Sequence, residues 1–146
     1  MSTATLSTPP TAEPHEAAQA FELTAPAAPT TVRVAREFVT ATLAATGHEP
    51  LAENARICVS DTVTNVVTHA RVPTLTVEVT AHGHRIVIAV RDNDPRRMPW
   101  SRLPGPGDES GRGLMLVRCL SHAFGVSWIW DGLELVGKQV WFELRP

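Results

Sequence analysis

The sequence predicts an α+β protein in which helices cover one side of a mostly antiparallel sheet. Segments 31–46 and 50–70 carry apolar residues at helical spacing. Segments 74–92 and 125–144 each contain two runs of strand-forming residues separated by a turn. Helices and strands grouped in this way favour a two-layer sandwich, and 146 residues are the length of one domain.

The N-terminal residues 1–19 differ in composition from the rest, with three prolines among Ser, Thr, Ala and Glu. Such a segment buries little apolar surface, so we expect a disordered tail followed by one domain at 20–146. Phe21 and Leu23 alternate with polar residues and predict a short edge strand, which ends near Pro26.

The two helices are predicted from their apolar stripes and from residues typical of helix ends. The first stripe begins at Thr31 with a threonine as N-cap, and Gly47 is placed where a helix stops. The second stripe is longer, running from about Pro50 to a stop before Pro73. Its β-branched residues suit a helix whose face is buried.

The strand pairs enclose an irregular stretch and a third helix. Alternation in 74–81, a turn at Gly83 and an apolar run at 85–92 predict a hairpin with one central strand. The segment 95–110 is rich in proline and glycine, and its length and composition are typical of a functional lid. Gly111 is expected to open a helix from about Leu114 to Ala123, before strands at 125–132 and 137–144.

The net charge and the lengths of the apolar runs exclude several classes of protein. A net charge of −2 provides no positive field, so direct nucleic-acid binding is not expected. The first basic residue is Arg33, and no long apolar run precedes it, as a secretory signal would require. No stretch is long and apolar enough for a membrane span, so we expect a cytoplasmic protein with no membrane contact.

Two polar side chains share one face of the second helix. Asp61 and Asn65 are four residues apart, so one lies above the other at the rim of the apolar stripe. Carboxylate and amide oxygens are hard ligands suited to Mg²⁺, which keeps several waters and shares substrate phosphates. The alternative is a solvated polar edge with a local hydrogen bond.

Asp92 ends the most apolar strand, where a carboxylate can accept a hydrogen bond from a ligand amine. The alternative is a turn aspartate that caps its own backbone. Further along, the segment "ESGRGLMLV" places Gly111 and Gly113 before a helix, so the backbone can approach an anionic ligand near the positive helix end. Arg112 adds a charged contact there, or is simply solvated.

Four motifs in this order resemble those of a known family. "SDTVTNVVTHA", "VRDNDP", "SGRGLMLV" and "GKQVWFEL" are similar to the N box, the two glycine boxes and the last strand of GHKL ATPases. With "AREFVTATL" before them, the chain looks more narrowly like the short anti-sigma-factor serine kinases of actinobacterial type. The resemblance covers about 20–145 and implies the GHKL ATPase-like two-layer fold.

The resemblance implies ATP and Mg²⁺ as cofactors and assigns roles to residues. Asn65 would bind the magnesium that bridges the phosphates, Asp92 would receive the adenine amino group, and Asp61 takes the place of the catalytic Glu. The phosphates would be wrapped by Gly111, Arg112, Gly113 and Leu114.

The chain departs from the family pattern at two points. Asp61 is one methylene shorter than the Glu that orients or deprotonates the attacking hydroxyl. The family's D-x-G-x-G becomes 92–96, "DNDPR", without either glycine. Pro95 lacks an N–H, and Asp94 would repel a nearby phosphate unless it turns away.

Two functions therefore compete. One is an ATP-dependent serine/threonine kinase that phosphorylates an anti-anti-sigma antagonist and also sequesters a sigma factor, with a homodimer as the family's usual assembly. The other is a non-catalytic GHKL-fold module that acts by protein contact with little or no ATP turnover. Asp61 and the lost glycines favour the second function, whereas Asn65 and "SGRGL" favour the first.

Overall fold

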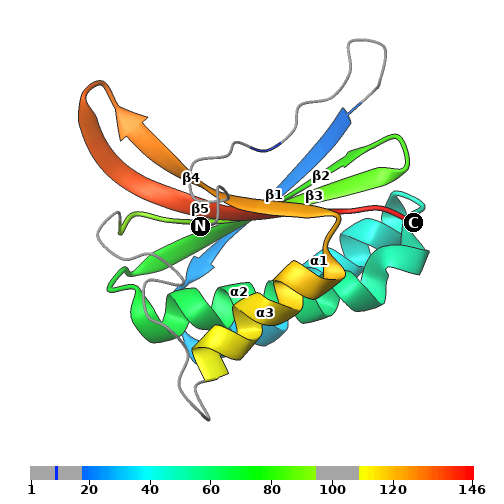
Figure 1. Cartoon of the computed structure of the whole chain (residues 1–146), viewed down its shortest axis with the longest axis horizontal. Coiled ribbons are helices and arrows are strands. Elements are labelled where there is room, and N and C mark those ends of the chain that lie inside the picture. The colour runs from blue at the N-terminus through cyan, green and yellow to red at the C-terminus, as the bar shows by residue number, and fades with distance from the viewer. Residues whose placement is uncertain (1–8, 10–17, 95–108) are drawn as a thin grey trace.

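The structure, a computed structural model, describes residue 9, residues 18–94 and residues 109–146, with the backbone alone for 109–114. Within these ranges a five-stranded sheet packs against a single layer of helices (Figure 1). The predicted α+β two-layer fold is confirmed. The expected lid lies outside the described residues except for its last two positions, and so does most of the expected tail.

The sheet is antiparallel throughout, in the order β1-β2-β3-β5-β4. Its strands are β1 (Ala18–Pro26), β2 (Thr74–His82), β3 (Arg85–Asp92), β4 (Ala123–Asp131) and β5 (Glu134–Leu144). β3 lies in the middle and is buried on both faces from Ile86 to Val90, as the apolar run predicts. β1 is the predicted edge strand, but it begins at Ala18, because pairing with β2 extends into the last two residues of the expected tail.

The helical layer contains α1 (Pro29–Ala45), α2 (Ala52–His69) and α3 (Glu109–Leu120), with a short 3₁₀ turn, η2 (Glu49–Leu51), before α2. α2 lies between α1 and α3 beneath the sheet (Figure 1). Its buried stripe includes Ala55, Val59, Val63 and Val66, which pack against the inner face of β2 and β3. The middle helix is therefore held on both sides and from above.

The ends of α1 correct one prediction and confirm another. The helix begins at Pro29, whose fixed φ suits the first helical position, and Ala28 is the N-cap without a side-chain hydrogen bond. The threonine cap is therefore wrong; instead Thr31 donates its hydroxyl to the carbonyl of Pro26, 2.5 Å away. Gly47 adopts φ +79° after the last turn, as predicted for a helix stop.

α3 differs most from expectation. It begins at Glu109 rather than Leu114, so Gly111 and Gly113 lie inside the helix instead of before it. The helix ends at Leu120 rather than Ala123, because Ala123 already pairs with Glu143 in the sheet. The N–H of His122 donates to the carbonyl of the same Glu143 at 2.8 Å.

Candidate functional site

Asp61 and Asn65 lie on α2 as predicted, one turn apart. Asn65 is buried, with 6% of its surface exposed, although asparagine usually lies on the surface. Asp61 is partly buried, and its Oδ2 is an enclosed acceptor for which no described residue provides a donor. Burial raises the pKa of Asp61 above its ordinary value of 3.8. An acceptor oxygen without a donor suits a cation, so the pair fits the predicted Mg²⁺.

The charge of Asp61 also reaches the preceding turn of α2. Burial, and then the negative charge of Asp61, raise the pKa of Cys58 to about 12. The thiol is fully buried and stays protonated at neutral pH. Cys58 is therefore part of the core and not a nucleophile.

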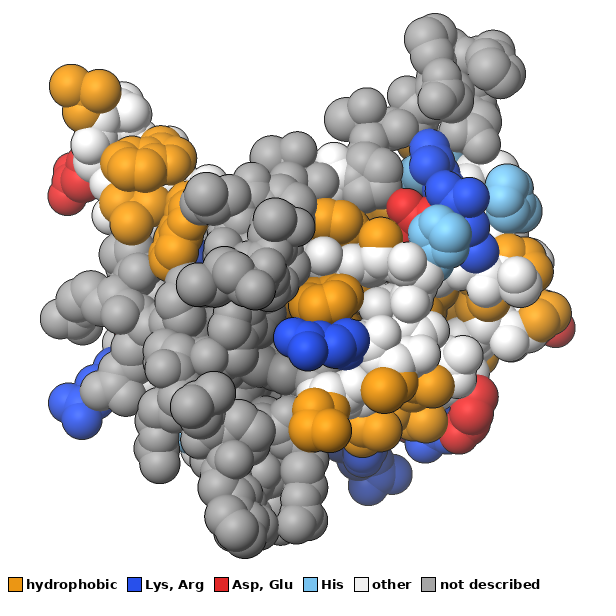
Figure 2. All heavy atoms as spheres, viewed as in Figure 1, with side chains coloured by type: hydrophobic (Ala, Val, Ile, Leu, Met, Phe, Trp, Pro, Cys, Tyr) orange, Lys and Arg blue, Asp and Glu red, His pale blue; other side chains and the backbone are white. Residues whose placement is uncertain are grey.

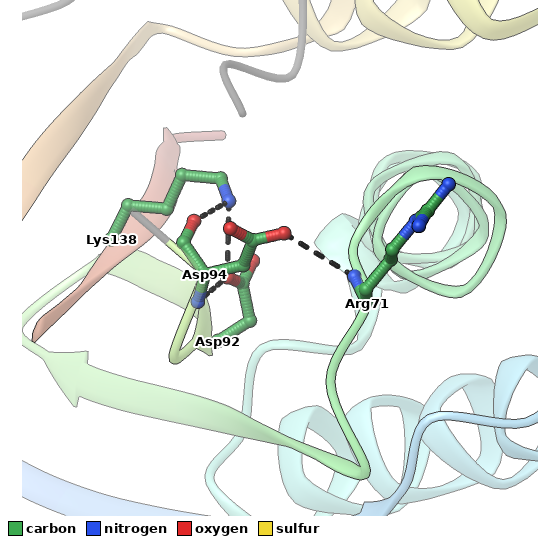
Figure 3. Close-up of polar contacts among 4 residues, drawn as sticks. All are labelled: Arg71, Asp92, Asp94 and Lys138. Atoms are coloured by element: carbon green, nitrogen blue, oxygen red, sulfur yellow. Dashed lines mark hydrogen bonds and ion pairs between the residues drawn. The ribbon is translucent and has the colours of Figure 1, made fainter. Parts of the chain in front are cut away.

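The end of β3 forms a buried charged cluster with the beginning of β5 (Figure 3). Asp92 and Lys138 have 4% and 3% of their surfaces exposed. Asp92 Oδ1 accepts hydrogen bonds from Lys138 Nζ at 3.0 Å and from the backbone N–H of Asp94 at 2.7 Å. Burial raises the pKa of Asp92, opposed by the hydrogen bond from Asp94 and by the charge of Lys138.

Asp94 connects this cluster to the helical layer. Its carbonyl accepts a second hydrogen bond from Lys138 Nζ, and its Oδ2 accepts one from the backbone N–H of Arg71 at 3.3 Å. Figure 3 shows the carboxylate directed toward the chain just after α2. The sequence predicted that Asp94 would repel a nearby phosphate unless it turned away. In the structure the residue has 2% of its surface exposed, and its carboxylate accepts a hydrogen bond from the backbone N–H of Arg71.

The link through Arg71 places both parts of the site at one end of the sandwich. Asn65 is four residues before His69, the last residue of α2, which is roughly 6 Å along the helix axis. Arg71 follows two residues later and is bonded to Asp94. The predicted metal ligand and the predicted adenine acceptor are thus held on two elements that meet at this end.

Sequence reasoning missed Lys138, although the strand pattern contained a signal. Val140, Phe142 and Leu144 alternate on the inner face of β5, and Lys138 has the same parity. The register pairs Lys138 with Asp92. A lysine on the buried face, opposite an aspartate at the end of a central strand, predicts an internal ion pair.

Gly137 lets β5 approach the Asp92 backbone closely. A Cβ at this position would lie 2.5 Å from the Asp92 carbonyl oxygen and 3.3 Å from the Asn93 Cα. Both are backbone atoms, which cannot move aside as a flexible side chain does. The glycine therefore allows Lys138 to reach the aspartate.

The four predicted phosphate contacts all lie in α3. Gly111 and Arg112 are in its first turn, where backbone N–H groups have no partner within the helix. Gly113 and Leu114 are in the next turn, where N–H groups donate to carbonyls four residues earlier. A phosphate loop containing all four would require this turn to unwind, so the contact of Gly113 and Leu114 with phosphates stays a prediction.

Two cavities adjoin these residues. One of about 430 Å³ touches Asp92 and Asn93 but is lined mainly by Thr76, Arg91 and Gln139, which face away from the helices. It is not the space beside Asn65. The other, of about 260 Å³, lies among the three helices and is lined by Arg36, Glu53, Arg56, Ile57, Ser60, Asp61 and Leu116. It gives Asp61 a polar pocket with two arginines.

Comparison with known proteins assigns this arrangement to a family. Residues 25–141 match the family described as the histidine kinase-like ATPase domain, which covers most of the chain. No curated protein matches the sequence. In the described part of the chain, every helix is too short or too polar to cross a membrane.

Proposed function

Because the chain belongs to the histidine kinase-like ATPase family, we propose that it is an ATP-binding regulatory protein related to the anti-sigma-factor serine kinases. It would contact a sigma factor and phosphorylate an anti-anti-sigma protein, the antagonist that releases the sigma factor from it. The observation that carries the proposal is the junction of α2 with β3: Asn65 and Asp92 are both buried, and the Arg71–Asp94 hydrogen bond joins the chain just after α2 to the end of β3.

Each part of the junction has a separate task. Asp92 accepts a hydrogen bond from the exocyclic amine of adenine. Its Oδ2 is available for this, because the hydrogen bonds from Lys138 and from the Asp94 backbone both end on Oδ1. Asn65 offers its amide oxygen to Mg²⁺, which neutralises phosphate charge when bound. The first turn of α3, with Gly111 and Arg112, offers N–H groups to the phosphates.

Asp61 is the proposed general base. Its pKa is raised by burial, which brings the carboxylate nearer the range in which it accepts a proton from a hydroxyl at neutral pH. The adjoining pocket with Arg36 and Arg56 gives a protein acceptor a route to this carboxylate. A serine hydroxyl entering there would lose its proton to Asp61 as its oxygen bonds to the terminal phosphorus of ATP, and the bond from that phosphorus to the bridging oxygen would break, so that ADP leaves.

An exposed apolar surface supports action through protein contact. Hydrophobic side chains stand at the tip of the β4–β5 hairpin, which projects at the upper left of Figure 2. Trp130 is 58% exposed and Leu133 is fully exposed. Large apolar side chains at the tip of a projecting hairpin are typical of a binding surface.

A non-catalytic binding module is the second candidate. Asp94 stands where the family has a glycine, and its atoms are engaged with Arg71 and Lys138. The shorter arm of Asp61 also lengthens the reach to the acceptor hydroxyl. Both observations favour slow phosphoryl transfer in a protein that retains nucleotide binding.

Calorimetry with ATP tests the nucleotide site. We expect binding that weakens when Mg²⁺ is chelated, and a loss of roughly tenfold or more in Asn65→Ala, because the amide ligand is removed. Asn54→Ala is the matched control, since Asn54 is an exposed asparagine on the same helix. Equal affinities for Asn65→Ala and the wild type would remove the metal role.

Transfer of labelled phosphate to a candidate antagonist separates the two functions. We expect slow transfer by the wild type and faster transfer by Asp61→Glu, because the added methylene moves the carboxylate toward the hydroxyl. No transfer by either protein, with ATP binding retained, would favour the non-catalytic module. Recovery of a sigma factor or antagonist in pull-downs, reduced by Leu133→Asp, would support the contact role.

A further inference from the structure

Lys138 is the only lysine in the sequence, and it is buried. Lysine is seldom fully buried unless it is paired, because removing an ammonium from water is costly. Here the charge is paired with Asp92 at 3.0 Å on the inner face of the sheet. A buried pair of this kind often contributes little net stability compared with apolar residues, so the position invites a second role.

Among the described residues, the hydrogen bonds of the pair leave one donor and one acceptor. An ammonium has three N–H donors, and Lys138 Nζ contacts two acceptors, Asp92 Oδ1 and the carbonyl of Asp94. Both printed bonds to Asp92 end on Oδ1, so Oδ2 takes part in neither. The remaining donor and acceptor belong to two groups that are in contact, with Nζ 3.0 Å from Oδ1.

This combination matches one edge of an aminopurine. The exocyclic amine of adenine is a donor, and a ring nitrogen on either side of it, N1 or N7, is an acceptor. Resting on the nucleotide site proposed above, we propose that Lys138 is a specificity-determining residue that donates a hydrogen bond to a ring nitrogen beside the amine received by Asp92. The base would then be recognised by a direct donor as well as by the aspartate.

Three observations fix the ammonium in place for this role. The β3–β5 register sets Lys138 opposite Asp92. Gly137 permits the close approach of the two strands, and the Asp94 carbonyl holds Nζ from a second direction. A donor that is already oriented loses less conformational entropy when a ligand binds than a flexible surface lysine does.

Analogues of ATP test the proposal on the unmodified protein. Replacing N1 or N7 by carbon removes one acceptor at a time, so we expect either 1-deaza-ATP or 7-deaza-ATP to bind at least about tenfold more weakly than ATP. Purine riboside triphosphate lacks the amine and reports on Asp92 instead. Wild-type protein that discriminates against the analogue without the amine, yet binds both deaza analogues as well as ATP, would overturn the role of Lys138 alone. Absence of ATP binding would overturn the nucleotide site and this proposal together.

A variant and a spectroscopic signal provide independent readouts. In Lys138→Met the discrimination against the sensitive deaza analogue should disappear, whereas Lys138→Arg should retain part of it. Because the chain has a single lysine, the side-chain NMR signal of Lys138 is observed without overlap from another lysine. This signal should shift with ATP and shift less with the sensitive analogue. Equal shifts with all the nucleotides would contradict the hydrogen bond.

Discussion

Asp61 and Asp92 are both withdrawn from solvent near the proposed site, yet the fold treats their charges differently. At Asp92 an ammonium and a backbone N–H donate to the carboxylate. At Asp61, Oδ2 is enclosed without a donor from the described residues. Burial raises the pKa of both groups. The strand end is thus largely complete on its own, whereas the helix face needs a cation or a proton from outside.

Removing the internal cation is the strongest way to break this comparison. Lys138→Met leaves Asp92 buried without its partner, so we expect a loss of about 3–5 kcal/mol in the free energy of unfolding. Arg91→Met is the matched control, because Arg91 pairs with Glu22 at 3.2 Å on the more exposed outer face. That exposed pair contributes about 1 kcal/mol or less. Equal losses in denaturant titrations would show that the buried pair is not special.

The close packing that supports the pair gives a smaller effect. In Gly137→Ala the new Cβ would meet the Asp92 carbonyl at 2.5 Å, so the strands must shift apart. We expect a loss of about 1–3 kcal/mol, typical of overpacking. The variant should also show a perturbed NMR signal for Lys138, since its contact with Asp92 is strained. Unchanged stability together with an unchanged lysine signal would contradict the tight approach.

The smallest effect is expected at Asp61 and has the opposite sign. Because the folded-state pKa is raised, the protonated form adds stability below the ordinary value of 3.8, and this is lost as the pH rises through the raised pKa. Asp61→Asn resembles the protonated form and should be more stable at neutral pH, by about 0.5–2 kcal/mol. The advantage should shrink as the pH falls toward 4. Thermal unfolding of both proteins across this range measures it, and a destabilised variant at pH 7 would contradict the prediction.

Hydrophobic periodicity predicted the sheet and the two long helices, because burial of one face requires that spacing. Gly47 and Gly83 both adopt positive φ where turns were predicted. The first turn of α3 was not predicted. Glycines at its third and fifth positions favour a loop when only local sequence is considered, and the fold places a helix there.

The part of the candidate site that lies within a single helix was predictable from the sequence. The spacing of Asp61 and Asn65 within a helix determines their common face. Lys138 and Asp92 are far apart in the sequence and meet only through the β3–β5 register, which local patterns do not specify. The contact between Asp94 and Arg71 depends on how the end of α2 packs against the sheet, so it also required the structure.

The account's central claim is that one ligand joins a base site at Asp92 to a metal-dependent phosphate site at Asn65. Calorimetric titration with adenosine and with ATP, each with and without Mg²⁺, tests this in the wild type, Asn65→Ala and Asp92→Asn. We predict that Asn65→Ala binds adenosine as the wild type does but loses the gain in ATP affinity that Mg²⁺ provides. We predict that Asp92→Asn binds adenosine and ATP more weakly by a similar factor but keeps the gain in ATP affinity from Mg²⁺. Asn65→Ala weakening adenosine as much as ATP, or Asp92→Asn leaving adenosine binding unchanged, would contradict the division of the site.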